Sequence, residues 1–138
     1  MNRKQKKIYL GRVHNLKSEI EETTRRYEMA MTEATHITQT INSNPGSGRG
    51  GSTENKLERA VLKMCAISDQ QRKKIRLLAQ ARKEVSEAIA QLHKPQYRLL
   101  LTLRYIDCMT IYDIAFTVGV SEKNAAETIN RAIDAIRL

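Results

Sequence analysis

Apolar residues in the last third of the chain recur at the spacing of two short helices. The first stripe contains Ile114, Ala115 and Val118, and the second contains Ala125, Ile129, Ala132, Ile133 and Ile136. Because residues three and four apart share one face of an α-helix, each stripe predicts an amphipathic helix. Thr110 and Ser121 stand where hydroxyl N-caps are expected, and Gly119 allows a tight turn between the helices. The pattern predicts a helix-turn-helix between residues 110 and 136.

Two much longer patterns precede this unit. Residues 3–42 carry one set of seam positions alternately three and four apart: Val13, Leu16, Ile20, Thr23, Tyr27, Ala30, Ala34, Ile37 and Ile41. Residues 54–92 carry a second set, which polar Ser68, Gln71 and Arg82 interrupt in the same phase: Leu57, Val61, Met64, Ile75, Leu78, Val85, Ile89 and Leu92. Alternating spacings of three and four are heptad seams, so both stretches predict long helices.

The intervening residues 43–53 are rich in Gly, Ser and Asn and predict a flexible loop between the two long helices. Two matched helices joined by a loop favour an antiparallel hairpin. Pro95 ends this hairpin, and a further short helix is expected from Gln96 to about Ile106, with Leu99, Leu100, Leu103 and Ile106 on one face.

We therefore predict an all-α protein in two parts. Residues 1–94 form a long, coiled-coil-like antiparallel hairpin, and residues 95–138 form a three-helix unit. A hairpin of two helices buries little apolar surface by itself, so we expect its seams to pack against a second subunit as well, which favours a homodimer.

The net charge is +9, and the basic surplus lies ahead of the helix-turn-helix. From Gln96 onward five basic residues meet five acidic ones, which leaves 19 basic and 10 acidic residues in positions 1–95. A basic surplus indicates a polyanionic partner. The first seventeen residues hold six cations and no acid, and we expect them to fray, the alternative being that they lie against DNA.

Folding of the hairpin about residue 48 brings basic residues of both helices to one level. The residues concerned are Arg25, Arg26, Arg72, Lys73, Lys74 and Arg76. Like charges held together are unfavourable unless an anion or solvent screens them. We expect a basic patch that contacts phosphates or an acidic partner, the alternative being a solvated charged surface.

Several classes of function find no support in the residues. No apolar run reaches the roughly 18 residues of a membrane span, and no apolar segment follows the basic N-terminus as in a secretory signal, so a cytoplasmic protein is expected. Cys65 and Cys108 lack the spacing of a metal site or a disulfide framework. Gly46, Gly48 and Gly51 spell GxGxxG, but no strand pattern precedes them. With three isolated histidines and no catalytic set, we expect no enzyme activity, no metal and no cofactor.

The C-terminal residues carry a set of motifs that resembles a known family. The motifs are Leu101-Thr102-Leu103-Arg104-Tyr105, Asp107, Thr110, Ile114-Ala115, Gly119-Val120-Ser121 and Arg131-Ala132. Together they resemble the region-four helix-turn-helix of the sigma-70 family over residues 96–138. With its basic hairpin, the chain is also similar to ArpU/RinA-type late-gene activators of phages and prophages. The resemblance implies a nucleoid-associated, sequence-specific regulator that binds double-stranded DNA and acts with the RNA polymerase of a bacterial host.

The second helix of a helix-turn-helix enters a DNA major groove and reads bases from its N-terminal half. The polar face of this helix carries Lys123, Asn124 and Glu127, which we expect to contact base edges because their side chains match guanine, adenine and cytosine. Phosphate contacts are expected from Ser121, Arg131, Thr110 and Tyr112. For each residue a solvated surface position is the alternative.

Two other functions compete with this interpretation. Small terminase subunits of phages also join a helix-turn-helix to a coiled coil, although they typically carry the DNA-binding unit first and assemble into rings. The second competitor is an interaction module that binds RNA polymerase instead of DNA. The balanced charge of residues 96–138 favours that second alternative.

Overall fold

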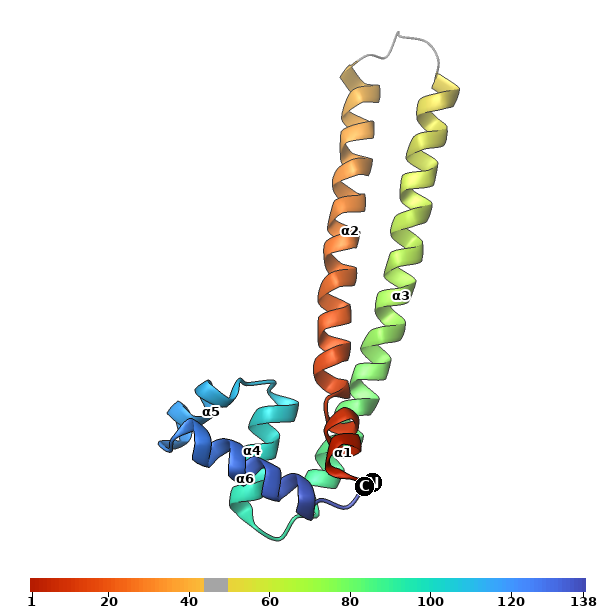
Figure 1. Ribbon diagram of the computed structural model, residues 1–138. Coiled ribbons are helices and arrows are strands. Elements are labelled where there is room, and N and C mark those ends of the chain that lie inside the picture. Colours follow the sequence, from red (N-terminus) through yellow and green to blue (C-terminus); the bar gives the residue numbers. More distant parts are fainter. Residues whose placement is uncertain (44–49) are drawn as a thin grey trace. The chain divides into compact units, whose positions relative to one another are not determined.

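The computed structural model describes residues 1–43 and 50–138 of the chain, and within them it contains helices and no strand (Figure 1). The elements in order are α1 (Arg3–Leu10), α2 (Arg12–Ser43), α3 (Gly50–Ala90), α4 (Pro95–Leu101), the π-helix η1 (Thr102–Ile106), α5 (Ile111–Val118) and α6 (Glu122–Ala135). The predicted all-α class is confirmed. Of the loop predicted at 43–53, residues 44–49 lie outside the described residues, as do Gly46 and Gly48 of the GxGxxG sequence. The prediction is wrong for the rest, because α2 extends to Ser43 and α3 begins at Gly50.

The described chain divides into two compact units. The composite unit consists of Met1–Lys17 and Arg76–Leu138, and the hairpin unit consists of Ser18–Ile75. This division differs from the boundary at residue 95 in the sequence interpretation. The division arises because two segments of the predicted hairpin share one core with the C-terminal helices. These segments are the N-terminal residues around Leu10 and Val13 and the C-terminal part of α3.

In the hairpin unit, α2 and α3 run antiparallel (Figure 1), and polar contacts fix their register. The Gln71 amide donates to the Thr24 hydroxyl at 2.7 Å, and Arg26 donates to the Gln70 side chain at 3.4 Å. Both pairs are centred close to residue 48, as the sequence predicted. The predicted α2 seam is also confirmed, because its described members in this unit are buried or half-buried: Ile20, Thr23, Tyr27, Ala30, Ala34 and Ile37.

The predicted α3 seam is wrong at two of its eight apolar positions, both in the hairpin unit. Val61 is 46% exposed and Ile75 is 49% exposed, whereas their neighbours Ala60 and Lys74 are buried and half-buried. The observed seam of α3 in the hairpin unit is Leu57, Ala60, Met64, Ile67, Gln71 and Lys74. The sequence analysis placed the larger Val61 in the seam, but the small side chain of Ala60 occupies it because alanine permits close packing of the two helices.

A buried polar layer explains how Gln71 and Lys74 occupy seam positions. Thr23 is fully buried and donates to the Glu19 carbonyl at 2.7 Å, and its hydroxyl accepts a hydrogen bond from Lys74 at 3.3 Å. The Lys74 ammonium also lies 4.0 Å from the Glu19 carboxylate. Burial of a polar group destabilises the fold unless the group finds a hydrogen-bond partner, and in this layer the polar groups bond to one another or to the backbone.

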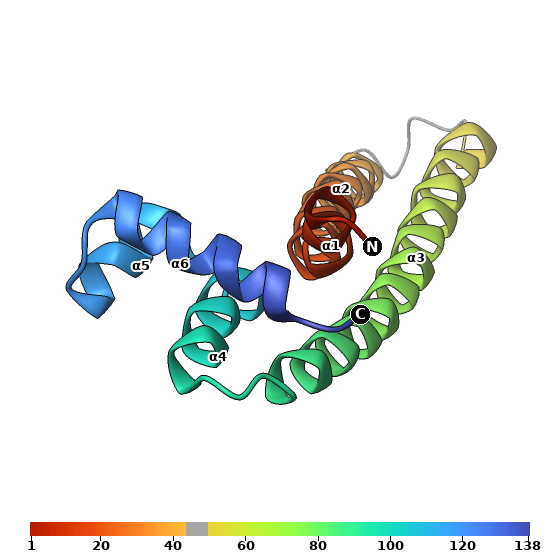
Figure 2. The ribbon, with the colours of Figure 1, turned by 60° about the horizontal axis from the view of Figure 1, so that its bottom comes forward.

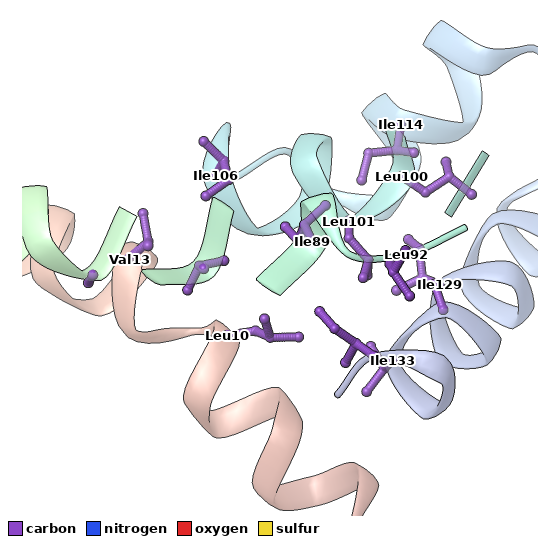
Figure 3. Close-up of a cluster of buried hydrophobic side chains, with 14 residues drawn as sticks. Leu10, Val13, Ile89, Leu92, Leu100, Leu101, Ile106, Ile114, Ile129 and Ile133 are labelled. Atoms are coloured by element: carbon purple, nitrogen blue, oxygen red, sulfur yellow. The ribbon is translucent and has the colours of Figure 1, made fainter. Parts of the chain in front are cut away.

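In the composite unit, one apolar core joins both ends of the described chain (Figure 3). Leu10 and Val13 contribute from the N-terminal segment, and the C-terminal part of α3, α4, η1, α5 and α6 supply the rest: Ala81, Val85, Ile89, Leu92, Leu100, Leu101, Ile106, Ile114, Ile129, Ala132, Ile133 and Ile136. A salt bridge of 2.7 Å between Arg12 and Glu84 supports the same packing. The expectation that the first seventeen residues fray is therefore wrong.

The helix predicted over 96–106 is found, but its buried face is rotated from the expected one. Leu99 was placed in the core and is 50% exposed, while Leu100 and Leu101 are buried. The cause is the change from α4 to the wider π-helix at Thr102, whose carbonyl accepts from the Asp107 N–H at 3.0 Å. A π-turn changes the angle between successive side chains, so the α-helical spacing assumed for residues 96–106 does not predict which of them share a face.

The turn of the helix-turn-helix has the predicted chemistry. The Thr110 hydroxyl accepts from the Asp113 N–H at 3.2 Å, and the Ser121 hydroxyl accepts from the Asn124 N–H at 3.1 Å. Between the two helices Gly119 adopts a left-handed conformation with φ 80°, and its N–H donates to the Ala115 carbonyl at 2.9 Å. Both N-caps and the turn are thus confirmed, and they fix where α6 begins.

Gly119→Ala is expected to lower the free energy of unfolding by about 1–2 kcal/mol, because an L-residue is strained at positive φ. No atom lies within 4 Å of the position that the added Cβ would occupy, so the loss comes from the backbone alone. Chemical denaturation measures it, with Gly119→Asn as a milder control because Asn tolerates this conformation. Equal stability of the alanine variant and the unsubstituted protein would contradict the left-handed turn.

Candidate nucleic-acid interface

Helix α6 carries an apolar face and an exposed polar face, and it lies beside α4 and α5 (Figure 2). Its apolar side packs on α4 and α5, which hold the helix from behind. Ala125, Ile129, Ala132 and Ile133 are buried on that side. The opposite side carries exposed Lys123, Asn124, Glu127, Arg131 and Asp134, which we call the reading face. Because rigid neighbours support the helix, its polar side chains are presented outward without rearrangement of the core.

The three residues predicted to contact bases lie together on the first two turns of the reading face. Lys123, Asn124 and Glu127 are all exposed, and the backbone N–H of Asn124 is bound by the N-cap while its side chain remains available. Lysine donates hydrogen bonds, glutamate accepts them, and asparagine does both. This set matches the range of donors and acceptors on base edges in a major groove.

Three of the four residues predicted to contact phosphates lie at the starts of α5 and α6, and the fourth, Arg131, lies in the C-terminal half of α6. Ser121 and Thr110 are the exposed N-caps of α6 and α5, Tyr112 lies exposed on the first turn of α5, and Arg131 is exposed on α6. Each capping hydroxyl accepts one backbone hydrogen bond and retains its own proton for donation. The first N–H groups of α6 add a positive dipole end, which favours a bound anion at this place.

The predicted basic patch is divided between the two units. Arg25, Arg26, Arg72 and Lys73 are exposed in the hairpin unit, whereas Arg76 belongs to the composite unit. Three members of the patch contact other residues of the hairpin unit: Arg26 with Gln70, Arg72 with Asp69 at 3.9 Å, and Lys74 with Thr23 and Glu19. Lys74 is half-buried in the polar layer, so it serves the packing of the hairpin.

The sequence interpretation missed the contact of α1 with the C-terminal end of α6. Arg3 forms a two-pronged ion pair with Asp134, in which its Nε donates to Oδ1 at 2.8 Å. Lys6 donates to the carbonyl oxygens of Asp134 and Ile136 at 3.1 and 2.8 Å. The only local signal was the capping box of Asn2 and Gln5, which marks a helix start without naming its partner.

The ion pair changes the titration of Asp134. The hydrogen bond from Arg3 is the main cause that lowers the pKa of this carboxyl, and the charges of Arg3, Lys6 and Lys7 act in the same direction. A carboxyl with a lowered folded-state pKa stabilises the folded state above its unfolded pKa, and this contribution is lost as the pH falls through the folded value. The contact between α1 and α6 should therefore weaken only in acid, below about pH 4.

Arg3→Gln is expected to raise the pKa of Asp134 toward the ordinary aspartate value of about 3.9, because glutamine carries no positive charge. An NMR titration of the Asp134 carboxyl carbon measures this shift, with Asp113 in the same spectrum as an internal reference. A titration of Asp134 that is identical in both proteins would show that the pair does not persist in solution.

Among the residues that the structure describes, no three His, Cys, Asp or Glu side chains gather so that they could hold a metal ion. None of the described helices combines the length and apolar character that crossing a membrane requires. Cys65 is exposed and Cys108 is half-buried, and both are free thiols.

Fold and reading face together define an all-α protein with a C-terminal helix-turn-helix. Residues 82–136 match the family model of sigma-70, region 4. No characterised protein and no solved structure gives a significant match to the chain. The matched segment is thus similar to a sigma-factor-like DNA-binding region. It begins within α3, ahead of the resemblance seen in residues 96–138, and takes in Val85, Ile89 and Leu92, which pack in the composite core.

Proposed function

We propose that the chain is a sequence-specific regulator of transcription that binds double-stranded DNA through α6. The observation that carries this proposal is the exposed reading face of α6 within a segment similar to sigma-70, region 4. In this mechanism the N-terminal half of α6 enters the major groove. Lys123 donates to guanine, Asn124 pairs with adenine and Glu127 accepts from cytosine. The phosphate-contacting residues Ser121, Arg131, Thr110 and Tyr112 fix the register on the duplex.

The biological setting is also part of the proposal. By its similarity to ArpU/RinA-type activators, we infer a phage or prophage protein that switches on late genes together with the host RNA polymerase. It acts in the bacterial cytoplasm at the nucleoid, needs no cofactor and is a regulator rather than an enzyme. A small terminase function predicts a large closed ring instead, so the mass in solution separates the two.

Selection from a random library of double-stranded DNA tests the central claim. The purified full chain is expected to enrich one sequence motif, and its affinity for that motif should exceed its affinity for scrambled DNA by about 10³-fold or more at physiological salt. Equal affinity for selected and scrambled DNA would reject sequence-specific binding.

A second function, binding of RNA polymerase, is favoured by one observation on α5. Phe116 is 82% exposed, and Tyr112 lies exposed one turn before it. Exposed aromatic residues on a rigid helix are typical of protein contacts. Copurification of host RNA polymerase with the unsubstituted chain but not with Phe116→Ala supports this role, whereas equal recovery with both proteins argues against it.

We also propose a homodimer that forms through the hairpin unit. Val61, Leu62 and Met29 are large apolar side chains that the single chain leaves exposed on this unit. A second copy would remove them from water, which is the usual reason that coiled-coil helices associate. Sedimentation equilibrium is expected to give twice the chain mass, and a monomer at micromolar concentration would reject the proposal.

A further inference from the structure

The reading face of α6 is not formed by the C-terminal residues alone. Asp134 lies three residues after Arg131 and seven after Glu127, which places all three side chains on one face of the helix. Arg3 reaches this face and pairs with Asp134. Helix α1 therefore borders the C-terminal end of the reading face.

Three contacts hold α1 in this place. Leu10 is fully buried in the composite core, where it lies close to Ile133 of α6 (Figure 3). Arg3 and Lys6 bind the side chain and the last carbonyl groups of α6, as described above. Residues 3, 6 and 10 form one stripe of α1, so this whole side of the helix is directed at α6 and the core.

The remaining cations of α1 lie beside that stripe. Lys4 and Lys7 each follow a residue of the stripe, Arg3 and Lys6, by one position. Both therefore project from the same flank of the stripe, and both are exposed. This flank lies close to the C-terminal end of the reading face, because Lys6 next to Lys7 donates to the Asp134 carbonyl at 3.1 Å. In agreement with this position, the charge of Lys7 helps to lower the pKa of Asp134. The flank thus presents two ammonium groups beside the C-terminal end of α6, where Asp134 is already paired with Arg3.

This arrangement alters the charge balance that made the C-terminal residues look neutral. Asp134 would repel a phosphate backbone if it were unpaired, but Arg3 compensates its charge. Lys4 and Lys7 then add positive charge from a segment 115 or more residues earlier in the sequence. A phosphate backbone is a polyanion of regular spacing, and lysines are suited to bind it without reading sequence.

We propose that α1 is part of the DNA-binding surface, with Arg3 neutralising Asp134 and Lys4 and Lys7 contacting backbone phosphates beside the groove that α6 enters. This inference rests on the proposed function. It adds a phosphate-contacting element outside the segment that resembles sigma-70, region 4.

The salt dependence of DNA binding tests the two lysines. The double variant Lys4→Ala, Lys7→Ala is expected to reduce the slope of log affinity against log salt by about 1.8, since each lost phosphate contact removes about 0.9. The loss should be equal on selected and scrambled DNA, because phosphates carry no sequence information. Lys63→Ala, Lys83→Ala is the matched control, as it removes the same charge from exposed positions of α3.

A slope in the Lys4, Lys7 variant equal to that of the control overturns the inference. Tighter binding after either substitution in α1 also overturns it, because α1 would then cover the reading face. Failure of the unsubstituted chain to bind any DNA rejects the proposed function and the inference with it, and so is distinguishable from the first result.

The role of Arg3 is tested by rescue. Arg3→Ala is expected to weaken DNA binding several-fold because it exposes the charge of Asp134, and the added substitution Asp134→Ala should restore most of the loss. If the double variant binds as weakly as Arg3→Ala, the effect is one of packing and the electrostatic account is wrong. Thermal unfolding of both variants identifies any loss of folded protein.

Discussion

Leu10→Ala is expected to lower the free energy of unfolding of the composite unit by about 2–5 kcal/mol, the range for a leucine removed from a well-packed core. Leu10 is fully buried among residues of α3 and α6, so the truncation leaves a cavity where the N-terminal and C-terminal segments meet. Urea unfolding followed by tyrosine fluorescence measures the loss, since four of the five tyrosines belong to this unit.

Ile8→Ala is the matched control for this prediction. Ile8 lies on the same helix and loses a similar apolar side chain, but it is 63% exposed. Its substitution should change the free energy of unfolding by no more than about 0.5 kcal/mol. Similar, small losses in both variants would mean that α1 is not part of the folded unit, and that the first seventeen residues fray as the sequence alone suggested.

Asn124→Ala and Lys123→Ala are each expected to cost about 1–3 kcal/mol of binding free energy on the selected DNA sequence, which is roughly five- to 150-fold in affinity. Both residues are exposed on the N-terminal half of the reading face, and truncation leaves the N-cap of α6 intact because Ser121 binds the backbone of residue 124. Fluorescence anisotropy with selected and scrambled duplexes measures the effect.

The specific prediction is that affinity for scrambled DNA changes much less than affinity for the selected sequence. Asn15→Ala and Lys83→Ala remove the same side chains from exposed positions outside α6 and serve as controls. Equal losses on both duplexes would show that Lys123 and Asn124 contact the backbone and do not read bases.

Features that depend on neighbouring residues were predictable from the sequence. The caps at Thr110 and Ser121 and the left-handed Gly119 require only local backbone chemistry, and all three are found. The apolar stripes of α5 and α6 were likewise correct, because helical spacing alone decides which side chains share a face. Exposure of the predicted contact residues of α6 follows from the same spacing.

Features that depend on distant packing were not predictable. The pair of Arg3 with Asp134 joins positions 131 residues apart, and no pattern in either segment names the other. In α3 the choice between Ala60 and Val61 depends on how closely the helices approach, which hydrophobicity does not reveal. The π-turn at Thr102 similarly altered which leucines of α4 are buried.

The packing of Leu10 near Ile133 has a consequence for the protein as it is made. While the ribosome synthesises the chain, α1 emerges first, and the helix that covers it is translated 123 residues later. At about 5–20 residues per second, this delay lasts roughly 6–25 s. Until then Leu10 and Val13 lack the α6 side chains that complete the core of the composite unit. The core of the composite unit can therefore close only when translation of α6 is finished.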